Sequence, residues 1–478
     1  MSAAEIGSPV ANRALDDLLS LLGLSRDDVG GAVAFVDDDP IAVGRHRPGA
    51  AAAAAVAAEA VGVARIWRMR GGEGQDLTVD LRRCVVPGLN SLAHQSQNGH
   101  ALSRAAAGRE QSFFRTKDGR VCFLLRAAHP ADQLAALLAL LQCQNTTEDL
   151  SAAAARWNGF ELEETLAELK LSGAVARSRQ EWLDHPQGQF LSRLPPVQVT
   201  RIGDGPPMPF APAMRPLSGL RVLDLARYLA GPVAARILAE QGADVLRATE
   251  PLNPDSPLNI MDTSPGKRSA FVDLGRPGDL DRLLELVSTA DVFVQGFRPG
   301  ALAKFGLSPE ALAERRPGIV YLSISAFGAG GPWMRRGAFD VLAQTVTGLA
   351  VEEGSPEEPL LQAAGLPIDY TTGYLAVAGI VSALVRRATE GGSYHIEVSL
   401  GRTSMWLQEI GRLPRDQWPS PGPQTVLCPA PREQDLVVRD TVYGALRQAA
   451  PLVQYSKTPP FWERGPFPLG SSRLEWLG

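Results

Sequence analysis

The stretch from Leu217 to Leu274 constrains the fold of this chain more than any other segment. Val222–Leu225 is a short apolar strand, and Gly231–Pro232 opens a helix because proline fits the first helical turn. Gly242 ends that helix, and Ala243–Ala248 forms a second apolar strand. A strand, a helix and a strand in this order predict a parallel sheet covered by helices. Such units place ligands where strands give way to helix N-termini.

Two further apolar strands continue this pattern. Asp291–Val294 and Ile319–Ile324 each end in a loop rich in glycine and proline, at 295–300 and 325–332. These loops let backbone N–H groups approach a ligand, although a single loop of this kind is more often an ordinary turn. GxGxxG and GxxxxGK[ST] are both absent from the sequence, so neither a dinucleotide site nor a P-loop is predicted.

The composition argues against several classes of partner and cofactor. The 478 residues carry a net charge of −5 without a basic excess, so no nucleic acid is expected. Six scattered histidines argue against a metal site, and four cysteines without a CxxC pair indicate a reducing, cytoplasmic compartment. The first residues lack the apolar segment of a signal peptide, and the alanine-rich run 50–60 is too short to span a bilayer. We therefore expect no membrane partner.

The expected fold class is α/β, a Rossmann-like parallel sheet with flanking helices, together with a smaller α+β domain. The small domain should contain a hairpin over Ser112–Leu125 and then amphipathic helices over 130–185. One strand and one helix are expected within Leu436–Ala449. The predicted segments are an N-terminal extension (1–48), the small α+β domain (49–206), a Pro-rich linker (207–216), the Rossmann-like domain (217–412) and a Pro-rich tail (413–478).

A weak internal repeat connects two distant segments. Leu77–Leu81 (LTVDL) and Ile396–Leu400 (IEVSL) each follow a helix, basic residues and a glycine-rich turn. A helix, a turn and a strand often occur in this order by chance. We nevertheless interpret the match as a duplication within the chain.

Asp369 stands directly before a mostly apolar helix expected over Tyr374–Arg387. One interpretation is an ordinary helix cap, because aspartate readily accepts backbone N–H bonds at this position. The other interpretation is functional. A carboxylate at a helix N-terminus at the edge of a sheet can act as a covalent nucleophile.

For several other polar residues the sequence allows both a functional and an ordinary structural role. Lys267 and Arg268 would hold a phosphate or lie solvated on the surface. Asp340 would hydrogen-bond a loop or cap the helix that follows it, and Arg227 and Arg298 would contact phosphates.

Taken together, these segments resemble the class III CoA-transferases, a family that includes formyl-CoA transferase, carnitine CoA-transferase and the α-methylacyl-CoA racemases. The resemblance is collinear. Its matching residues are Leu217–Asp224, Ala230–Pro232, Leu238–Ala239, Gly242–Val245, Lys267–Ser269, Asp273–Leu274, Ala290–Val292, Phe297–Gly300, Gly306–Leu307, Ser323–Ser325, Phe327–Gly328, Gly331–Pro332, Phe339–Asp340 and Asp369–Gly373.

The resemblance implies an interlocked class III fold and an acyl-CoA:carboxylate CoA-transferase. Asp369 would be the catalytic aspartate that forms an anhydride and then an aspartyl-CoA thioester. The implied substrates are an acyl-CoA and a small carboxylic acid, with coenzyme A as a substrate rather than a cofactor. A homodimer is implied; the alternative is that the fused order here lets one chain supply both halves of an active unit. The residues implied to bind CoA are Arg227, Tyr228, Leu229, Phe297, Arg298 and Lys304.

The chain also departs from the family pattern. Residues 110–206 resemble the small domain that normally follows the β/α domain, and 50–90 resemble a second copy of the helix and strand that leave it. The glycine-run loop of some transferases is missing, and Gly108 alone does not supply it. These departures favour, as an alternative, a catalytically weak CoA-binding paralogue with a regulatory or scaffolding role. A racemase is a second alternative, but Phe339 stands where racemases carry a proton-transferring histidine.

Overall fold

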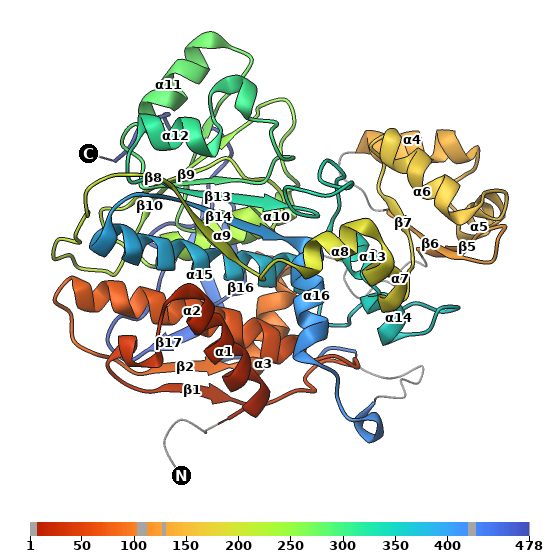
Figure 1. Cartoon of the computed structure of the whole chain (residues 1–478), viewed down its shortest axis with the longest axis horizontal. Helices are drawn as coiled ribbons and strands as arrows, with labels where there is room; N and C mark the ends of the chain where they lie inside the picture. The colour runs from red at the N-terminus through yellow and green to blue at the C-terminus, as the bar shows by residue number, and fades with distance from the viewer. Residues whose placement is uncertain (1–6, 103–111, 127–130, 419–426, 478) are drawn as a thin grey trace.

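The computed structural model describes residues 7–102, 112–126, 131–418 and 427–477, so Gly108 lies outside the described residues. Figure 1 shows a layered body with a smaller lobe at one side. A large sheet carries helices on both faces, and below it two long helices separate this sheet from a smaller one. The smaller lobe holds a third sheet covered by short helices.

The large sheet has seven strands, six of them parallel. If the six parallel strands are numbered along the chain, their order is 3-2-1-4-5-6, which is the Rossmann order. The predicted α/β Rossmann-like fold is therefore confirmed. In sheet order the strands are β11 (Arg268–Phe271), β10 (Asp244–Thr249), β9 (Arg221–Asp224), β12 (Val292–Gln295), β13 (Val320–Ser325), β14 (Ser393–Ser399) and the antiparallel β8 (Gln198–Gly203).

Successive side chains along a strand point to opposite sides of this sheet, and helices bury both of its faces. Val222 packs with α9 and α15 on one face, whereas its neighbour Leu223 packs with α11 and α12 on the other. The helices of this domain are α9 (Ala230–Glu240), α10 (Pro257–Thr263), α11 (Pro277–Val287), α12 (Pro309–Arg315), α13 (Asp340–Val346), α14 (Leu349–Glu353), α15 (Pro367–Glu390) and α16 (Leu400–Ile410).

Helix α15 begins at Pro367, seven residues earlier than the predicted start at Tyr374. Proline suits the first helical turn, and Asp340 accepts N–H bonds from Ile368 and Asp369. The capping carboxylate is therefore supplied by the first residue of α13, which the local sequence does not reveal.

The N-terminal residues pack beneath α15 rather than with the small lobe. Helix α2 lies along α15 and also contacts α1. By length and composition α2 and α15 are both long and apolar enough to cross a membrane, but here they are buried as core helices. The elements of this unit are α1 (Pro9–Leu22), β1 (Val33–Val36), α2 (Pro48–Met69), β2 (Leu77–Asp80), α3 (Leu81–Arg83), a π-helical turn (Cys84–Leu89) and β17 (Val453–Tyr455).

The small lobe contains the predicted hairpin, which is confirmed as β5 (Phe113–Arg115) paired with β6 (Val121–Leu124). Strand β7 (Gly173–Val175) completes its sheet. The strands of the segment predicted as one domain over 49–206 thus divide among four sheets. Besides this one, β2 pairs with β1 and β17, β8 joins the large sheet, and the strands within 96–101 join a sheet with C-terminal strands. The helices of the lobe and of the connection to β8 are α4 (Ala131–Leu141), α5 (Thr147–Ala154), α6 (Gly159–Glu168), α7 (Arg179–Asp184) and α8 (Pro186–Ser192).

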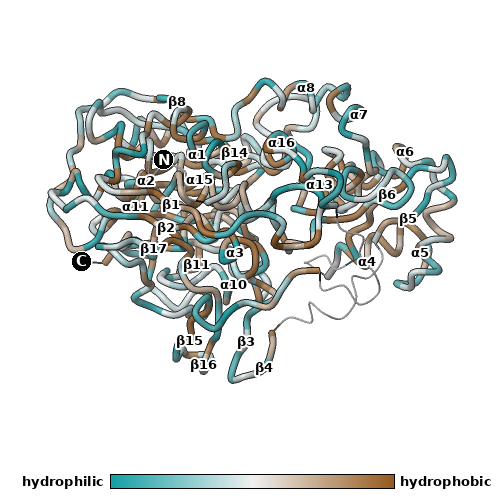
Figure 2. The backbone as a smooth tube through the Cα atoms, turned by 90° about the horizontal axis from the view of Figure 1, so that it is seen from below, coloured by the Kyte–Doolittle hydropathy of each residue, from teal (hydrophilic) through white to brown (hydrophobic). Residues whose placement is uncertain are grey.

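The C-terminal segment differs from its prediction. Instead of a strand and a helix, Leu436–Ala449 forms the hairpin β15 (Leu436–Thr441) and β16 (Gly444–Ala449). Gly444 has a φ of 94°, a left-handed value that glycine tolerates and that lets the chain reverse. The edge of β16 pairs with β3 (Ser96–Gln97), which in turn pairs with β4 (His100–Ala101). Figure 2 shows these two distant segments side by side.

His46 joins the N-terminal unit to α14. Its ring is buried, with Nδ1 2.6 Å from Glu353 and Nε2 3.1 Å from Glu352. Burial alone would lower its pKa, but the hydrogen bonds and charges of the two glutamates prevail and raise the pKa of His46 above its usual 6.5. The folded state therefore holds the proton more tightly than the unfolded chain does.

This linkage predicts how stability depends on pH. The contribution of His46 is fully present below pH 6.5 and is lost as the pH rises through its folded pKa, at about 1.4 kcal/mol per unit of pKa difference. Urea unfolding of wild type and His46→Gln should be measured between pH 6 and 9. The difference between their free energies of unfolding should narrow as the pH rises. His100→Gln, at an exposed position on β4, serves as the control. A gap that stays constant with pH would contradict this assignment.

Candidate functional site

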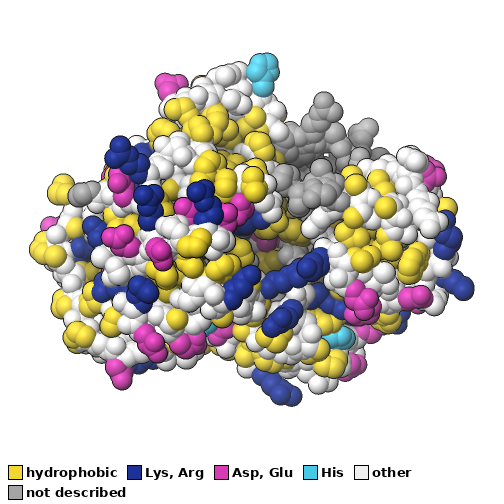
Figure 3. Space-filling view, turned by 90° about the horizontal axis from the view of Figure 1, so that it is seen from above, with side chains coloured by type: hydrophobic (Ala, Val, Ile, Leu, Met, Phe, Trp, Pro, Cys, Tyr) yellow, Lys and Arg dark blue, Asp and Glu magenta, His cyan; other side chains and the backbone are white. Residues whose placement is uncertain are grey.

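A cleft of about 290 Å³ opens between the large sheet and the small lobe. Figure 3 shows Lys and Arg side chains gathered along the hollow between these two parts of the molecule. Six of the seven residues predicted for the site line this one cleft. They are Arg227, Tyr228, Leu229, Phe297, Arg298 and Asp369. Lys304 does not line it, since it lies exposed on the short 3₁₀ turn Ala303–Phe305, with Nζ over the Phe305 ring.

The cleft lies at the topological switch point of the sheet. The loops after β9 and β12 form one wall, and these neighbouring strands connect to helices on opposite faces. Open α/β sheets bind ligands in the crevice at such a point, because the two loops diverge and leave space between them. The predicted residues from the two loops therefore meet for a topological reason.

The turn after β9 is held in an unusual conformation. Tyr228 has a φ of 65°, which is uncommon for a residue with a large side chain. The buried Asp255 accepts the Tyr228 N–H at 3.3 Å and pairs with Arg227 and Arg247. Tyr228 also packs edge-on against Phe339, with ring centroids 5.2 Å apart. Sequence reasoning missed Asp255, because nothing in its loop distinguishes it from an ordinary surface aspartate.

Asp369 occupies the third residue of α15 and is 8% exposed, with its side chain lining the cleft. Close packing brings it towards the start of α9. One turn after Asp369, a Cβ on Gly373 would lie 2.8 Å from the carbonyl oxygen of Ala230. The N-termini of α9 and α15 therefore meet at the cleft, where their positive ends favour a developing negative charge.

The Asp369 carboxyl is not the helix cap that local sequence suggests. Asp340 fills that role, with Oδ2 2.7 Å from the Ile368 N–H and 3.0 Å from the Asp369 N–H. Within the described residues, no hydrogen bond reaches the Asp369 side chain. The capping duty and the cleft-facing carboxyl thus belong to two different residues, which leaves Asp369 available for chemistry.

Burial, and then repulsion from Asp340, raise the pKa of Asp369 well above its ordinary value. Burial also raises the pKa of Asp340, to about 6. The charged form of Asp369 is therefore unfavourable in the empty cleft. Conversion of this carboxylate into an uncharged acyl derivative would remove that unfavourable charge.

Asp340→Asn tests this electrostatic coupling. Asparagine retains an oxygen that can cap α15 but removes the charge beside Asp369. A nucleophilic carboxylate at position 369 would react faster with an acyl donor as the pH rises and Asp369 ionises, and the acid limb of that pH–rate profile should move to lower pH in the variant. Single-turnover kinetics across pH 5–9 measure this. Asp340→Ala, which also loses the cap, should cost about 1 kcal/mol of stability. An unmoved acid limb in Asp340→Asn would contradict the coupling.

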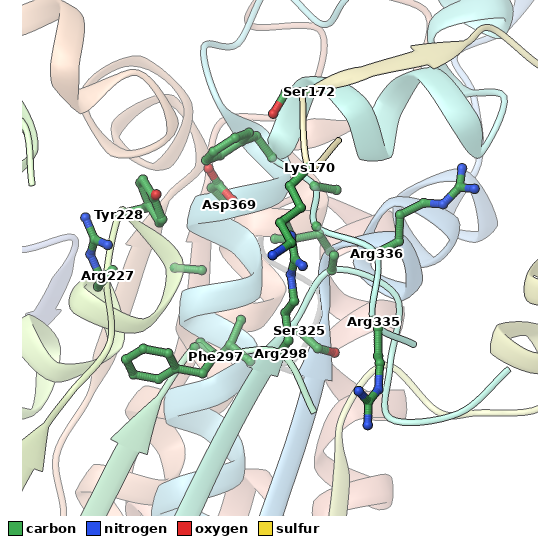
Figure 4. Close-up of a pocket in the computed structure, with 18 of the residues that line it drawn as sticks. Lys170, Ser172, Arg227, Tyr228, Phe297, Arg298, Ser325, Arg335, Arg336 and Asp369 are labelled. Atoms are coloured by element: carbon green, nitrogen blue, oxygen red, sulfur yellow. The ribbon is translucent and has the colours of Figure 1, made fainter. Parts of the chain in front are cut away.

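Basic side chains from both sides surround the opening of the cleft. Lys170 and Ser172 come from the small lobe, whereas Arg298 and Arg335 come from the loops of the large sheet. Figure 4 shows Lys170 and Arg298 reaching into the middle of the cleft, while Arg336 turns away from Asp369. Arg336 pairs with Glu163 and Glu164 of the lobe. Such a rim suits a ligand that carries several negative charges.

Two residues predicted as phosphate contacts or solvated side chains have other roles. Lys267 is buried, with Nζ 2.7 Å from both Asp224 and the Pro232 carbonyl oxygen, so both predictions for it are wrong. Burial lowers the pKa of Lys267 to about 8. Arg268 forms a two-pronged ion pair with Asp244. Arg268 joins the neighbouring strands β11 and β10, whereas Lys267 connects the start of β11 to β9 and α9, so both cations are engaged within the protein.

Among the described residues, no group of three or more His, Cys, Asp or Glu side chains is arranged to hold a metal ion. No histidine is found among the described residues that line the cleft. The chemical groups in the cleft are thus one carboxyl, several cations, backbone amides and aromatic rings.

Comparison with known proteins agrees with this geometry. Residues 217–416 match CoA-transferase family III, and this range contains both walls of the switch point and Asp369. This segment, 217–416, belongs to CoA-transferase family III. An acetyl-coenzyme A transferase, nodX, from Hypoxylon pulicicidum is 30% identical over 331 residues, covering 64% of this chain and 56% of that protein. The succinate–glutarate CoA-transferase of Agrobacterium fabrum is 34% identical over 203 residues, covering 39% and 51%.

A solved CAIB/BAIF family protein from Brucella suis is 31% identical, covering 41% of this chain and 55% of that chain, with a TM-score of 0.38. The chain thus spans about half the length of several relatives it matches. The match to the family begins where the linker ends and leaves the small lobe and the N-terminal unit outside it.

Proposed function

We propose that this family III chain is an acyl-CoA:carboxylate CoA-transferase with Asp369 as its covalent nucleophile. The observation that carries the proposal is the Asp369 carboxyl, which lines the cleft while Asp340 caps its helix. Because the Asp369 carboxyl lines the cleft, a bound substrate can reach it. The neighbouring cations and helix N-termini can stabilise the negative charge that develops during the reaction.

The reaction transfers CoA without water, metal or redox change. An Asp369 oxygen attacks the thioester carbonyl of the donor, the C–S bond breaks, and CoA thiolate leaves an acyl-aspartyl anhydride. The thiolate then attacks the aspartyl carbonyl, which frees the donor acid and forms an aspartyl-CoA thioester. The acceptor carboxylate attacks that thioester, the C–S bond breaks, and CoA thiolate leaves an anhydride between Asp369 and the acceptor. The thiolate then attacks the acceptor acyl carbonyl, which forms the new acyl-CoA and restores the Asp369 carboxylate.

The cleft residues have distinct tasks in this scheme. Arg298 and Lys170 would pair with the negative charges of CoA or of the acid. Phe297 presents an aromatic face, and its backbone N–H is held by Gln295 at 2.7 Å, which fixes the loop. Tyr228 would hold the acyl end beside Asp369, since its strained turn is supported by Asp255.

The alternatives fare less well on the same observations. Racemisation needs a second acid–base group beside Asp369, but Phe339 packs on Tyr228 there and offers no proton. A CoA-binding paralogue without activity would not need a buried carboxyl facing the cleft at an electrostatic cost. We further propose that the protein works in the cytoplasm, on a small carboxylic acid as acceptor, without a bound cofactor.

An isotope experiment tests the nucleophile directly. In the scheme above, one oxygen of the acceptor carboxylate remains on Asp369 when the acyl group departs. Turnover with an acceptor acid carrying heavy oxygen should therefore label the peptide that contains Asp369, detected by mass spectrometry after digestion. A panel of acyl-CoA donors and acids identifies a productive pair first. Productive turnover that leaves Asp369 unlabelled would exclude the covalent scheme.

A further inference from the structure

The internal repeat extends further in the structure than in the sequence. Pro48–Leu81 and Pro367–Leu400 correspond without insertion or deletion, from the first residue of one helix to the first residue of the next. The residue before each second helix caps it: Asp80 accepts the Arg83 N–H, and Ser399 accepts the Arg402 N–H. Corresponding positions thus perform the same local task.

The strands of the two copies also have the same neighbours. Strand β14 pairs in parallel with β13 on one side and antiparallel with β8 on the other. Strand β2 likewise pairs in parallel with β1 and antiparallel with β17. Figure 1 shows the resulting order of layers: a sheet, α15, α2 and a second sheet. The two long helices pack face to face, with Gly62 of α2 so close to Val381 of α15 that a Cβ there would lie 2.3 Å from its side chain.

The likeness reaches the nucleophile position itself. Asp340 caps α15 by accepting the N–H groups of its second and third residues, Ile368 and Asp369. In the other copy, Asp39 caps α2 by accepting the N–H groups of its second and third residues, Gly49 and Ala50, at 3.2 and 2.8 Å. Ala50 therefore stands where Asp369 stands, and it is fully buried.

We propose that residues 33–89, together with β17, are a second copy of the nucleophile-bearing core that has lost its nucleophile, with Ala50 in place of Asp369. This half-site has no catalytic role. It covers α15 from within the same chain, so that one chain contains one complete site. This inference rests on the proposed function only in taking Asp369 as the nucleophile.

Two further observations support a self-contained chain. Both walls of the cleft come from one chain, since Lys170 and Ser172 of the small lobe face Asp369 across it. In the second copy, the copy that lacks the nucleophile, Asp39 still has a structural role, because it accepts hydrogen bonds from two helix N–H groups. The nucleophile has no such role, since without a ligand a buried second carboxyl beside Asp39 would only repel it.

A complementation experiment tests whether one chain suffices. Asp369→Ala removes the nucleophile, and Ser172→Trp fills the cleft from the small lobe. Each variant alone should be inactive. The two variants are then co-expressed with different tags and either purified through both tags in turn or assayed as a mixture. Both preparations should stay inactive. Active wild type should elute at the mass of one chain, 51.0 kDa. If it forms a dimer, its specific activity should stay the same when dilution dissociates that dimer. Restored activity in the mixture would show that sites are shared between chains and would overturn the inference.

The silent half-site is tested by Ala50→Asp, with Ala50→Ser as a matched control. The new carboxyl beside Asp39 should lower the urea midpoint well below that of the serine variant, and a trapped acyl adduct should remain at one per chain, on Asp369. Two adducts per chain in Ala50→Asp would show a working second cleft and overturn the inference. Failure of the proposed function appears differently, as a wild-type chain that turns over without any adduct on Asp369.

Discussion

Replacing Asp369 by alanine is expected to reduce CoA transfer by at least about three orders of magnitude, because no other carboxyl is found among the described residues that line the cleft. Binding of CoA should change by less than about tenfold, or ~1.4 kcal/mol, since the cations and Phe297 remain. Thioester exchange followed by mass spectrometry measures the first effect, and calorimetric titration with CoA measures the second.

The same variant should be more stable than wild type at pH 8. Burial and Asp340 raise the pKa of Asp369, so ionisation of this group destabilises the fold as the pH rises. Asp369→Asn, which keeps the shape of the side chain, is the matched control and should share both the loss of transfer and the gain of stability. A loss of CoA binding as large as the loss of transfer would instead indicate a structural role.

The largest expected effect on stability comes from Glu163→Ala in the small lobe. Glu163 forms a two-pronged ion pair with Arg177, at 2.7 and 2.6 Å, and also accepts the Val175 N–H. Both side chains are almost fully buried. Although burial opposes its ionisation, the bonds from Arg177 and Val175 lower the pKa of Glu163. Removal of the carboxylate leaves a guanidinium buried without its partner, at a cost of about 3–5 kcal/mol.

Urea unfolding followed by hydrogen exchange in β7 and α6 measures this loss where it occurs. Glu164→Ala is the control, because Glu164 is exposed and pairs only with Arg336, so the loss should stay below about 1 kcal/mol. Since Arg336 joins Glu163 to the cleft loop, Glu163→Ala should also weaken substrate binding. Equal effects of the two substitutions would show that the buried pair is not what stabilises the lobe.

Much of the site was predictable because it depends on local patterns. The alternation of strands and helices after Leu217 predicts the parallel sheet and places Arg227 and Phe297 on loops that follow strands, whereas the adjacency of those strands, β9 and β12, is a finding of the structure. Asp369 was identified through resemblance, since its immediate sequence is equally typical of a helix cap. The fate of Lys267 was not predictable, because a basic residue before a strand has the same sequence pattern whether it faces solvent or a buried aspartate.

Segments that depend on distant partners were predicted least well. The start of α15 was placed too late because its cap comes from Asp340. The strand β16 was predicted as a helix, but it pairs with its sequence neighbour β15 in a hairpin, and its other edge pairs with the distant β3. The cap of α15 and the outer edge of β16 thus both involve residues that are far apart in sequence.

The sequence by itself determined the parallel α/β fold, the positions of its ligand-facing loops and the presence of a repeat, because these follow from the period of apolar residues and from turn residues. The tertiary structure alone decided which carboxyl caps α15 and which faces the cleft, and it alone revealed that Ala50 occupies the position equivalent to Asp369. Local sequence describes what each residue can do. Only packing decides which partner satisfies it and which group remains free to react.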